Sequence, residues 1–112
     1  MPKPANRPYS RYSLNALELM GNLIREGRIA ANLTAESLAQ RAGISRSLLQ
    51  RIEKGDPGCA IGSVFEVAAI VGLPLFEADT KTLATRLGFS NEKRALLPKS
   101  VRLSKKVVKD DF

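Results

Sequence analysis

The chain has 112 residues, of which 44% are hydrophobic, so it is long enough for one domain with a modest core and short tails. Its 18 Lys and Arg against 11 Asp and Glu give a net charge of +7, which favours a polyanionic partner, either nucleic acid or an acidic membrane surface. There is no histidine and one cysteine, Cys59, which excludes Ser–His and Cys–His nucleophile pairs, histidine-based zinc sites and an internal disulfide. Catalysis by Lys, Asp or Tyr stays open in principle, but no spacing suggests it, and we expect no enzyme, no cofactor and no metal.

The apolar segments do not favour a membrane. The longest apolar run, residues 67–76, is too short to span a bilayer and is broken by Gly72 and Pro74. No basic amphipathic segment with large aromatic residues indicates a membrane surface. The basic N-terminus is followed by no apolar signal core, so we expect a cytoplasmic protein.

The first twelve residues hold three prolines and three basic residues, MPKPANRPYSRY. This composition predicts an extended arm over residues 1–12, which is either a disordered end or a segment lying along phosphates. Ser13 is a candidate N-cap for a first long helix that ends near Ala31. Its core positions recur at helical spacing: Leu17, Met20, Leu23, Ile24 and Ala31. We expect the folded domain to span residues 13–88.

The segment from Leu33 to Gly55, LTAESLAQRAGISRSLLQRIEKG, carries the clearest pattern in the chain. Thr34 predicts the cap of one short helix, Gly43 its left-handed end, and Ser45 the cap of a second helix. Each helix has one apolar side at a period of 100° per residue. Two short helices joined by a glycine-containing turn predict a helix-turn-helix.

The polar side of the second short helix suits contacts with DNA. Arg46, Ser47, Gln50 and Arg51 offer two guanidinium groups, a hydroxyl and an amide to base edges in the major groove. Lys54 follows them and can reach a phosphate. The alternative is an ordinary solvated face on an amphipathic helix.

Beyond Gly55, the residues 56–58 (Asp-Pro-Gly) predict a turn, and residues 61–71 predict a helix that is apolar almost all round. That helix is either a central core helix or one that also places Val67 or Ile70 in a dimer interface. A further helix is expected from Asp79 to Gly88.

The tail over residues 89–112 is basic and carries interleaved apolar residues. It is either a disordered solubilising extension or a segment that orders on a partner protein. For the second case we expect these residues to bind the partner: Leu96, Val101, Arg102, Leu103 and Phe112.

Residues 17–75 resemble the Cro/repressor-type, XRE-like helix-turn-helix family. This resemblance implies an all-α, compact lambda-repressor-like domain of about five helices with a basic C-terminal tail. It implies base contacts from Arg46, Ser47 and Arg51 with Gln50 close by. We expect phosphate contacts from Ser45 and Lys54 as well. Thr34 and Ala35 match the residues that lie against a phosphate, but Ala35 replaces a glutamine common in the family, which leaves backbone N–H groups there. The resemblance also implies an ion pair between Arg28 and Glu53.

The stretch EKGDPGCAIGSVFEVAAIVGLPLF, followed by LLPKSVR and an acidic-aromatic end, is similar to antitoxins of the HipB type. This implies a dimeric repressor of an inverted-repeat operator that partners a HipA-like serine/threonine kinase toxin. The acidic Asp56 departs from the basic loop of phage members of the family. Two alternatives remain, namely a stand-alone phage- or plasmid-type repressor and a protein-interaction module that uses the same fold.

Overall fold

The structure is a computed structural model that describes residues 8–101 and residue 103. These residues form α-helices and one short 3-10 turn, with no strand among them. The elements in order are α1 (Arg11–Ala30), α2 (Ala35–Ala42), α3 (Arg46–Glu53), α4 (Ile61–Ile70), η1 (Leu75–Glu77) and α5 (Thr80–Ala95). The prediction of an all-α, lambda-repressor-like helix-turn-helix fold of about five helices is confirmed.

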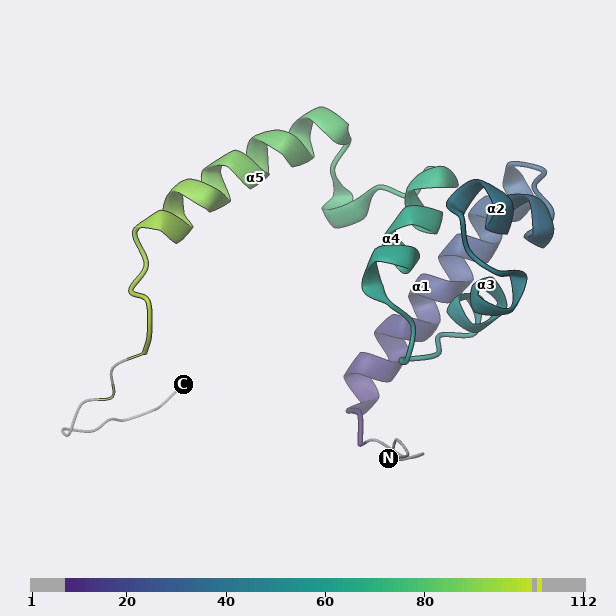
Figure 1. The fold of residues 1–112 in the computed structure, drawn as a ribbon, viewed down its shortest axis with the longest axis horizontal. Helices are drawn as coiled ribbons and strands as arrows, with labels where there is room; N and C mark the ends of the chain where they lie inside the picture. Colours follow the sequence, from purple (N-terminus) through teal and green to yellow (C-terminus); the bar gives the residue numbers. More distant parts are fainter. Residues whose placement is uncertain (1–7, 102, 104–112) are drawn as a thin grey trace. The chain divides into compact units, whose positions relative to one another are not determined.

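The chain divides into two compact units, Met1–Ala78 and Asp79–Phe112, earlier than the predicted domain end at residue 88. In the first unit α1 packs against α3, and α2 packs against both α3 and α4 (Figure 1). The core is apolar and draws on all four helices: Ile24, Leu38, Ala39, Leu49, Ile52, Val67 and Ala68. The apolar sides predicted for the two short helices therefore meet in one cluster.

The start of α1 differs from the prediction. Ser10, not Ser13, caps the helix, and its Oγ accepts the Ser13 N–H at 3.1 Å. Arg11 and Tyr12 are therefore helical, which corrects the predicted arm over residues 1–12 at its last two positions. Both serines can cap, and using the earlier one adds backbone hydrogen bonds to the first turn. Residues 1–7 of the predicted arm lie outside the described residues.

The end of α5 also differs from the prediction. The helix does not stop at Gly88 but continues to Ala95, shortly before Pro98. A single glycine lowers helix propensity by only about 1 kcal/mol, whereas a proline disfavours helical backbone in the residue before it. Asp79 caps α5 by accepting the Thr82 N–H at 2.7 Å, and no residue of α5 is buried.

A buried glycine brings α1 and α3 into close contact. A Cβ atom at Gly21 would lie 2.5 Å from the Glu53 carbonyl oxygen and 2.7 Å from that of Ile52. No side chain fits between these backbones, so Gly21 lets the end of α3 lie directly on α1. This contact holds the helix that carries the candidate DNA-contacting residues.

Candidate nucleic-acid interface

The turn between α2 and α3 is built from local signals. Gly43 ends α2 in the left-handed region at φ 71°, which glycine adopts without a steric penalty. Ser45 caps α3, with its Oγ accepting the Leu48 N–H at 3.0 Å. Ile44, between them, packs against the core. The turn is therefore held at both ends and by an apolar anchor.

One side of α3 is buried and the other is exposed. Leu49 and Ile52 lie in the core, and Leu48 packs against it. Arg46, Ser47, Gln50 and Arg51 are all exposed, as is Lys54, which ends the helix. The four residues expected to contact bases thus share an open surface with the lysine expected to contact phosphate. This surface carries three cationic groups. The two guanidinium groups can form forked hydrogen bonds with bases, and the lysine can reach a phosphate.

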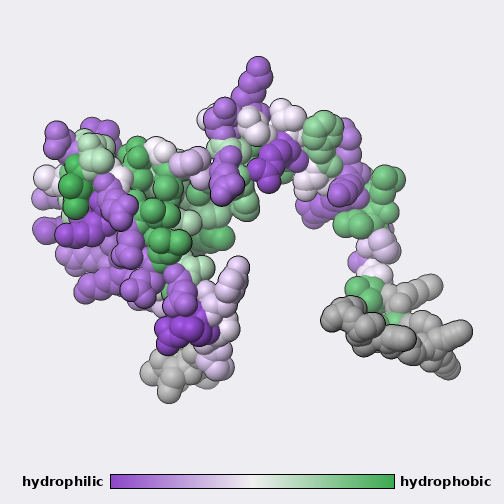
Figure 2. Space-filling view, turned by 180° about the vertical axis from the view of Figure 1, so that it is seen from behind, coloured by the Kyte–Doolittle hydropathy of each residue, from purple (hydrophilic) through white to green (hydrophobic). Residues whose placement is uncertain are grey.

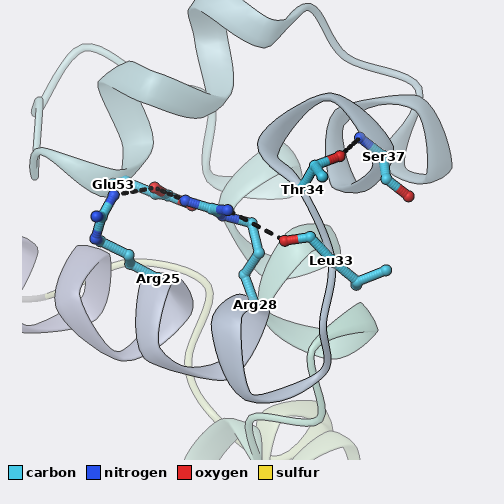
Figure 3. A network of polar contacts seen from close by, with 6 residues as sticks. All are labelled: Arg25, Arg28, Leu33, Thr34, Ser37 and Glu53. Atoms are coloured by element: carbon cyan, nitrogen blue, oxygen red, sulfur yellow. Dashed lines mark hydrogen bonds and ion pairs between the residues drawn. The ribbon is translucent and has the colours of Figure 1, made fainter.

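A charge network lies at the end of α3 (Figure 3). The Arg28 Nε donates to Glu53 Oε2 at 2.8 Å, and its Nη2 donates to Oε1 at 3.1 Å. A third hydrogen bond runs from Arg28 Nη1 to the Leu33 carbonyl at 3.1 Å. Arg25 approaches the same Glu53 carboxylate at 3.8 Å, as Figure 3 also shows.

This network joins the end of α1, the loop before α2 and the end of α3. The hydrogen bond with Glu53 raises the pKa of Arg28 above its ordinary value, although partial burial opposes the charge. The carboxylate of Glu53 would repel phosphate if it stood alone beside the DNA-contacting surface. Arg28 pairs with this carboxylate through two hydrogen bonds, so the charge of the only acidic residue of α3 is compensated there.

The start of α2 offers backbone donors. Thr34 is exposed and caps the helix, with its Oγ1 accepting the Ser37 N–H at 3.0 Å (Figure 3). Ala35 is partly buried and packs against the core, and its side chain adds no polar group here. Backbone N–H groups at the start of a helix can bind an anion. The contact of Thr34 and Ala35 with a phosphate stays a prediction.

The loop after α3 holds an interaction that the sequence interpretation missed. The Arg51 Nε donates to Asp56 Oδ2 at 2.8 Å, and the Gly58 N–H donates to Asp56 Oδ1 at 2.7 Å. The hydrogen bond from Arg51 lowers the pKa of Asp56, and the same contact raises that of Arg51. The only available signal was the pairing of opposite charges five residues apart across Gly55.

Val67, one of the two residues predicted for a dimer interface, is 0% exposed within its own chain and lies in the core. Ile70 is half-buried and packs against the same core. The exposed apolar residues of α4 lie on another side, where Ile61 is 68% exposed. An all-round apolar helix gives no periodic signal, so the sequence did not indicate which side faces inward.

The predicted partner-binding residues in the second unit are exposed where they are described. Leu96, Val101 and Leu103 are exposed, as is the neighbouring Leu97. Arg102 and Phe112 lie outside the described residues.

Within the part of the chain that the structure describes, no helix is both long enough and apolar enough to cross a lipid bilayer.

The capped glycine turn and the exposed cationic side of α3 define a DNA-binding helix-turn-helix protein. A family model described as a helix-turn-helix domain matches residues 19–97, and the chain belongs to this family. The match extends through α5 and supports an XRE-type helix-turn-helix. A search of curated proteins found no match.

Proposed function

We propose that this protein is a sequence-specific transcriptional repressor that binds an inverted-repeat operator as a two-fold dimer. The observation that carries the proposal is the division of α3 into a core side and an exposed side with Arg46, Ser47, Gln50 and Arg51. An arginine fork can donate two hydrogen bonds to guanine O6 and N7, and a glutamine amide can pair with adenine. The Ser47 hydroxyl can either donate a hydrogen bond to a base edge or accept one from it.

Phosphate contacts would set the register of α3 on the duplex. Lys54 and Ser45 flank the base-contacting residues, and the N-terminus of α2 at Thr34 and Ala35 presents backbone donors. Such contacts favour DNA of any sequence, whereas the arginines of α3 add the preference for particular bases. The two groups therefore have different signatures in binding experiments.

The test is to select a preferred duplex from random DNA and compare it with a scrambled duplex. Arg46→Ala and Arg51→Ala should each weaken binding to the preferred duplex by about 1–3 kcal/mol and relax preference at one base position. Lys54→Ala should weaken binding to both duplexes similarly and flatten the salt dependence. Equal losses on both duplexes for the arginine variants would show that Arg46 and Arg51 contact phosphates rather than bases. Wild-type protein that binds neither duplex would favour a protein-interaction module instead.

A dimer follows from the small number of bases that one such domain can contact. We define the α4 face as Ile61, Phe65 and Ala69, which recur every fourth residue, together with Phe76. Phe65 and Phe76 pack edge to face, with ring centroids 6.3 Å apart, and Phe76 is 65% exposed. Figure 2 shows hydrophobic side chains gathered on the part of the first unit that carries α4. We propose that a second copy of the chain covers this face.

In such a dimer the two α3 helices should lie roughly 34 Å apart, one turn of DNA, so the operator should be an inverted repeat. Ile61→Asp should weaken dimerisation about tenfold or more, because it places a charge in an apolar interface. An acidic residue in the first turn of α4 also suits the helix dipole, so folding should be retained. Leu19→Asp, on the exposed surface of α1, is the matched control. A monomer by light scattering at micromolar concentration, free and on DNA, would refute the dimer.

The exposed apolar residues of the second unit favour a more particular role, that of an antitoxin. Leu96 and Leu103 are 86% and 90% exposed, and α5 buries no residue. A segment that orders on a protein surface needs apolar anchors of this kind together with charges that set its register. We propose that residues 96–112 bind a partner, and the similarity to HipB-type antitoxins points to a HipA-like serine/threonine kinase.

Truncation after Ala95 tests this role and leaves α5 whole. The shortened protein should lose the kinase and keep binding to the preferred duplex within about tenfold, because α3 is intact. The paired substitution Leu96→Asp and Leu97→Asp should have the same effect in the full-length chain. If the truncated protein retains the kinase, or if no kinase co-purifies with the full chain from its native host, a stand-alone repressor is the better description.

A further inference from the structure

The guanidinium of Arg51 is held in place from the loop that follows α3. Asp56 accepts from the Arg51 Nε at 2.8 Å, while its other oxygen accepts the Gly58 N–H at 2.7 Å. Each carboxylate oxygen thus has a separate partner, and the backbone bond fixes the direction in which the carboxylate faces Arg51. Gly58 also leaves room for the arginine, since a Cβ there would lie 3.1 Å from Arg51 Nη2.

The contact with Asp56 occupies only one edge of the guanidinium. Within the described residues the two Nη groups of Arg51 donate to no acceptor, although the side chain is held at Nε. These are the donors that pair with a guanine edge. Arg46, at the other end of the same surface, makes no side-chain hydrogen bond or ion pair within the described residues. The two arginines therefore differ in how far they are ordered before DNA arrives.

We propose that Asp56 is a positioning residue that holds the Arg51 guanidinium ready for a base contact, an inference that rests on the proposed function. An arginine side chain loses rotamer freedom when it binds, and a partner that already orders it reduces that loss. Arg51 should accordingly contribute more to base preference than Arg46, which must be ordered by the DNA itself. Asp56 thereby becomes a determinant of specificity without contacting a base.

The electrostatic effect of the same carboxylate has the opposite sign. A negative charge near phosphates weakens binding to any DNA, so its removal should tighten binding to all sequences. A positioning role predicts instead that its removal weakens binding to the preferred sequence alone. The two effects are separated by comparing preferred and scrambled DNA.

The experiment measures binding of the full chain to the preferred and scrambled duplexes by titration at fixed salt. Asp56→Asn removes the charge and keeps a side-chain oxygen for the Gly58 N–H. It should weaken binding to the preferred duplex about three- to tenfold and leave the scrambled duplex unchanged or tighter. In an Arg51→Ala background Asp56→Asn should cause no further loss on the preferred duplex.

Two controls isolate the pair. In an Arg46→Ala background the loss caused by Asp56→Asn should persist in full, because Arg46 does not contact Asp56. Glu66→Gln removes an exposed carboxylate of α4 and should shift both duplexes alike. Thermal unfolding of each variant shows that the comparison is made between folded proteins.

Two outcomes would overturn the positioning role. One is that Asp56→Asn tightens binding to both duplexes, and the other is that its loss on the preferred duplex persists without Arg51. Wild-type protein that binds both duplexes equally would refute the proposed function itself, and with it the role of Asp56. A readout without DNA is the Nε–H resonance of Arg51, which should exchange with solvent more slowly in the wild type than in Asp56→Asn.

Discussion

Removing Arg28 should destabilise the first unit far more than removing an ordinary surface arginine. The Arg28 and Glu53 side chains are only 11% and 9% exposed, and two hydrogen bonds join them. We choose Arg28→Met because methionine keeps most of the side-chain length and removes the charge. The substitution leaves the Glu53 carboxylate buried and deprives the Leu33 carbonyl of its donor.

The magnitude follows from this geometry. Breaking a buried ion pair by removing one partner costs about 3–5 kcal/mol. Arg25 remains 3.8 Å from Glu53 but is 61% exposed, so it recovers less than about 1 kcal/mol. We therefore expect Arg28→Met to lower the free energy of unfolding by about 3 kcal/mol. The double variant Arg28→Met with Glu53→Leu should lie within about 1 kcal/mol of the wild type, since an apolar pair of similar volume replaces the ions.

The assay is urea denaturation followed by far-UV circular dichroism at fixed protein concentration. Because the pair is buried, the loss should change little between low and high salt. If Arg28→Met lies within about 0.5 kcal/mol of the wild type, Glu53 must be solvated by water or neutralised by Arg25, and the reasoning fails. If the double variant is as unstable as Arg28→Met, the effect comes from packing rather than from an unpaired charge.

Three further predictions concern the scaffold and its pH dependence. Gly21→Ala should destabilise the fold by about 1–3 kcal/mol in denaturant titrations, because its Cβ would meet carbonyl oxygens of α3, whereas Asn22→Ala on the exposed side should be neutral or stabilising. Thr34→Ala should cost about 1 kcal/mol by loss of the α2 cap, and Thr34→Ser should restore it. The folded-state pKa of Asp56 is lowered below its unfolded value, so its contribution should be present above about pH 4 and lost as the pH falls through the lowered pKa. The slow exchange of the Arg51 Nε–H should be lost in the same acid range, and a loss at pH 6 would contradict the assignment.

The helix caps and the turn of residues 33–55 could be predicted from the sequence because each depends on interactions within three or four residues. Thr34, Gly43 and Ser45 set helix ends through hydrogen bonds to nearby backbone groups or through a backbone conformation that glycine favours. The exposed side of α3 followed from the period of its apolar residues. The family model agrees with the type of domain that these signals indicated.

The sequence did not predict helix ends or the buried side of a helix correctly where neighbouring residues have nearly equal local preferences. Ser10 and Ser13 can both cap α1, and Gly88 weakens a helix without ending it. Val67 could not be placed because α4 is apolar on nearly every side, and the packing of α4 on the shared core decides which side is buried.

The sequence by itself determined the capped helices, the turn between them and the cationic side of α3, because hydrogen bonds and apolar periodicity within a few residues specify each of these. The tertiary structure alone decided that Gly21 lies against the carbonyl oxygens at the end of α3 and that Val67 faces the core. It also decided that Asp56 turns back onto Arg51. These features depend on the relative placement of backbones, which no residue type specifies, since an aspartate or glycine has the same local preferences whichever helix packs beside it.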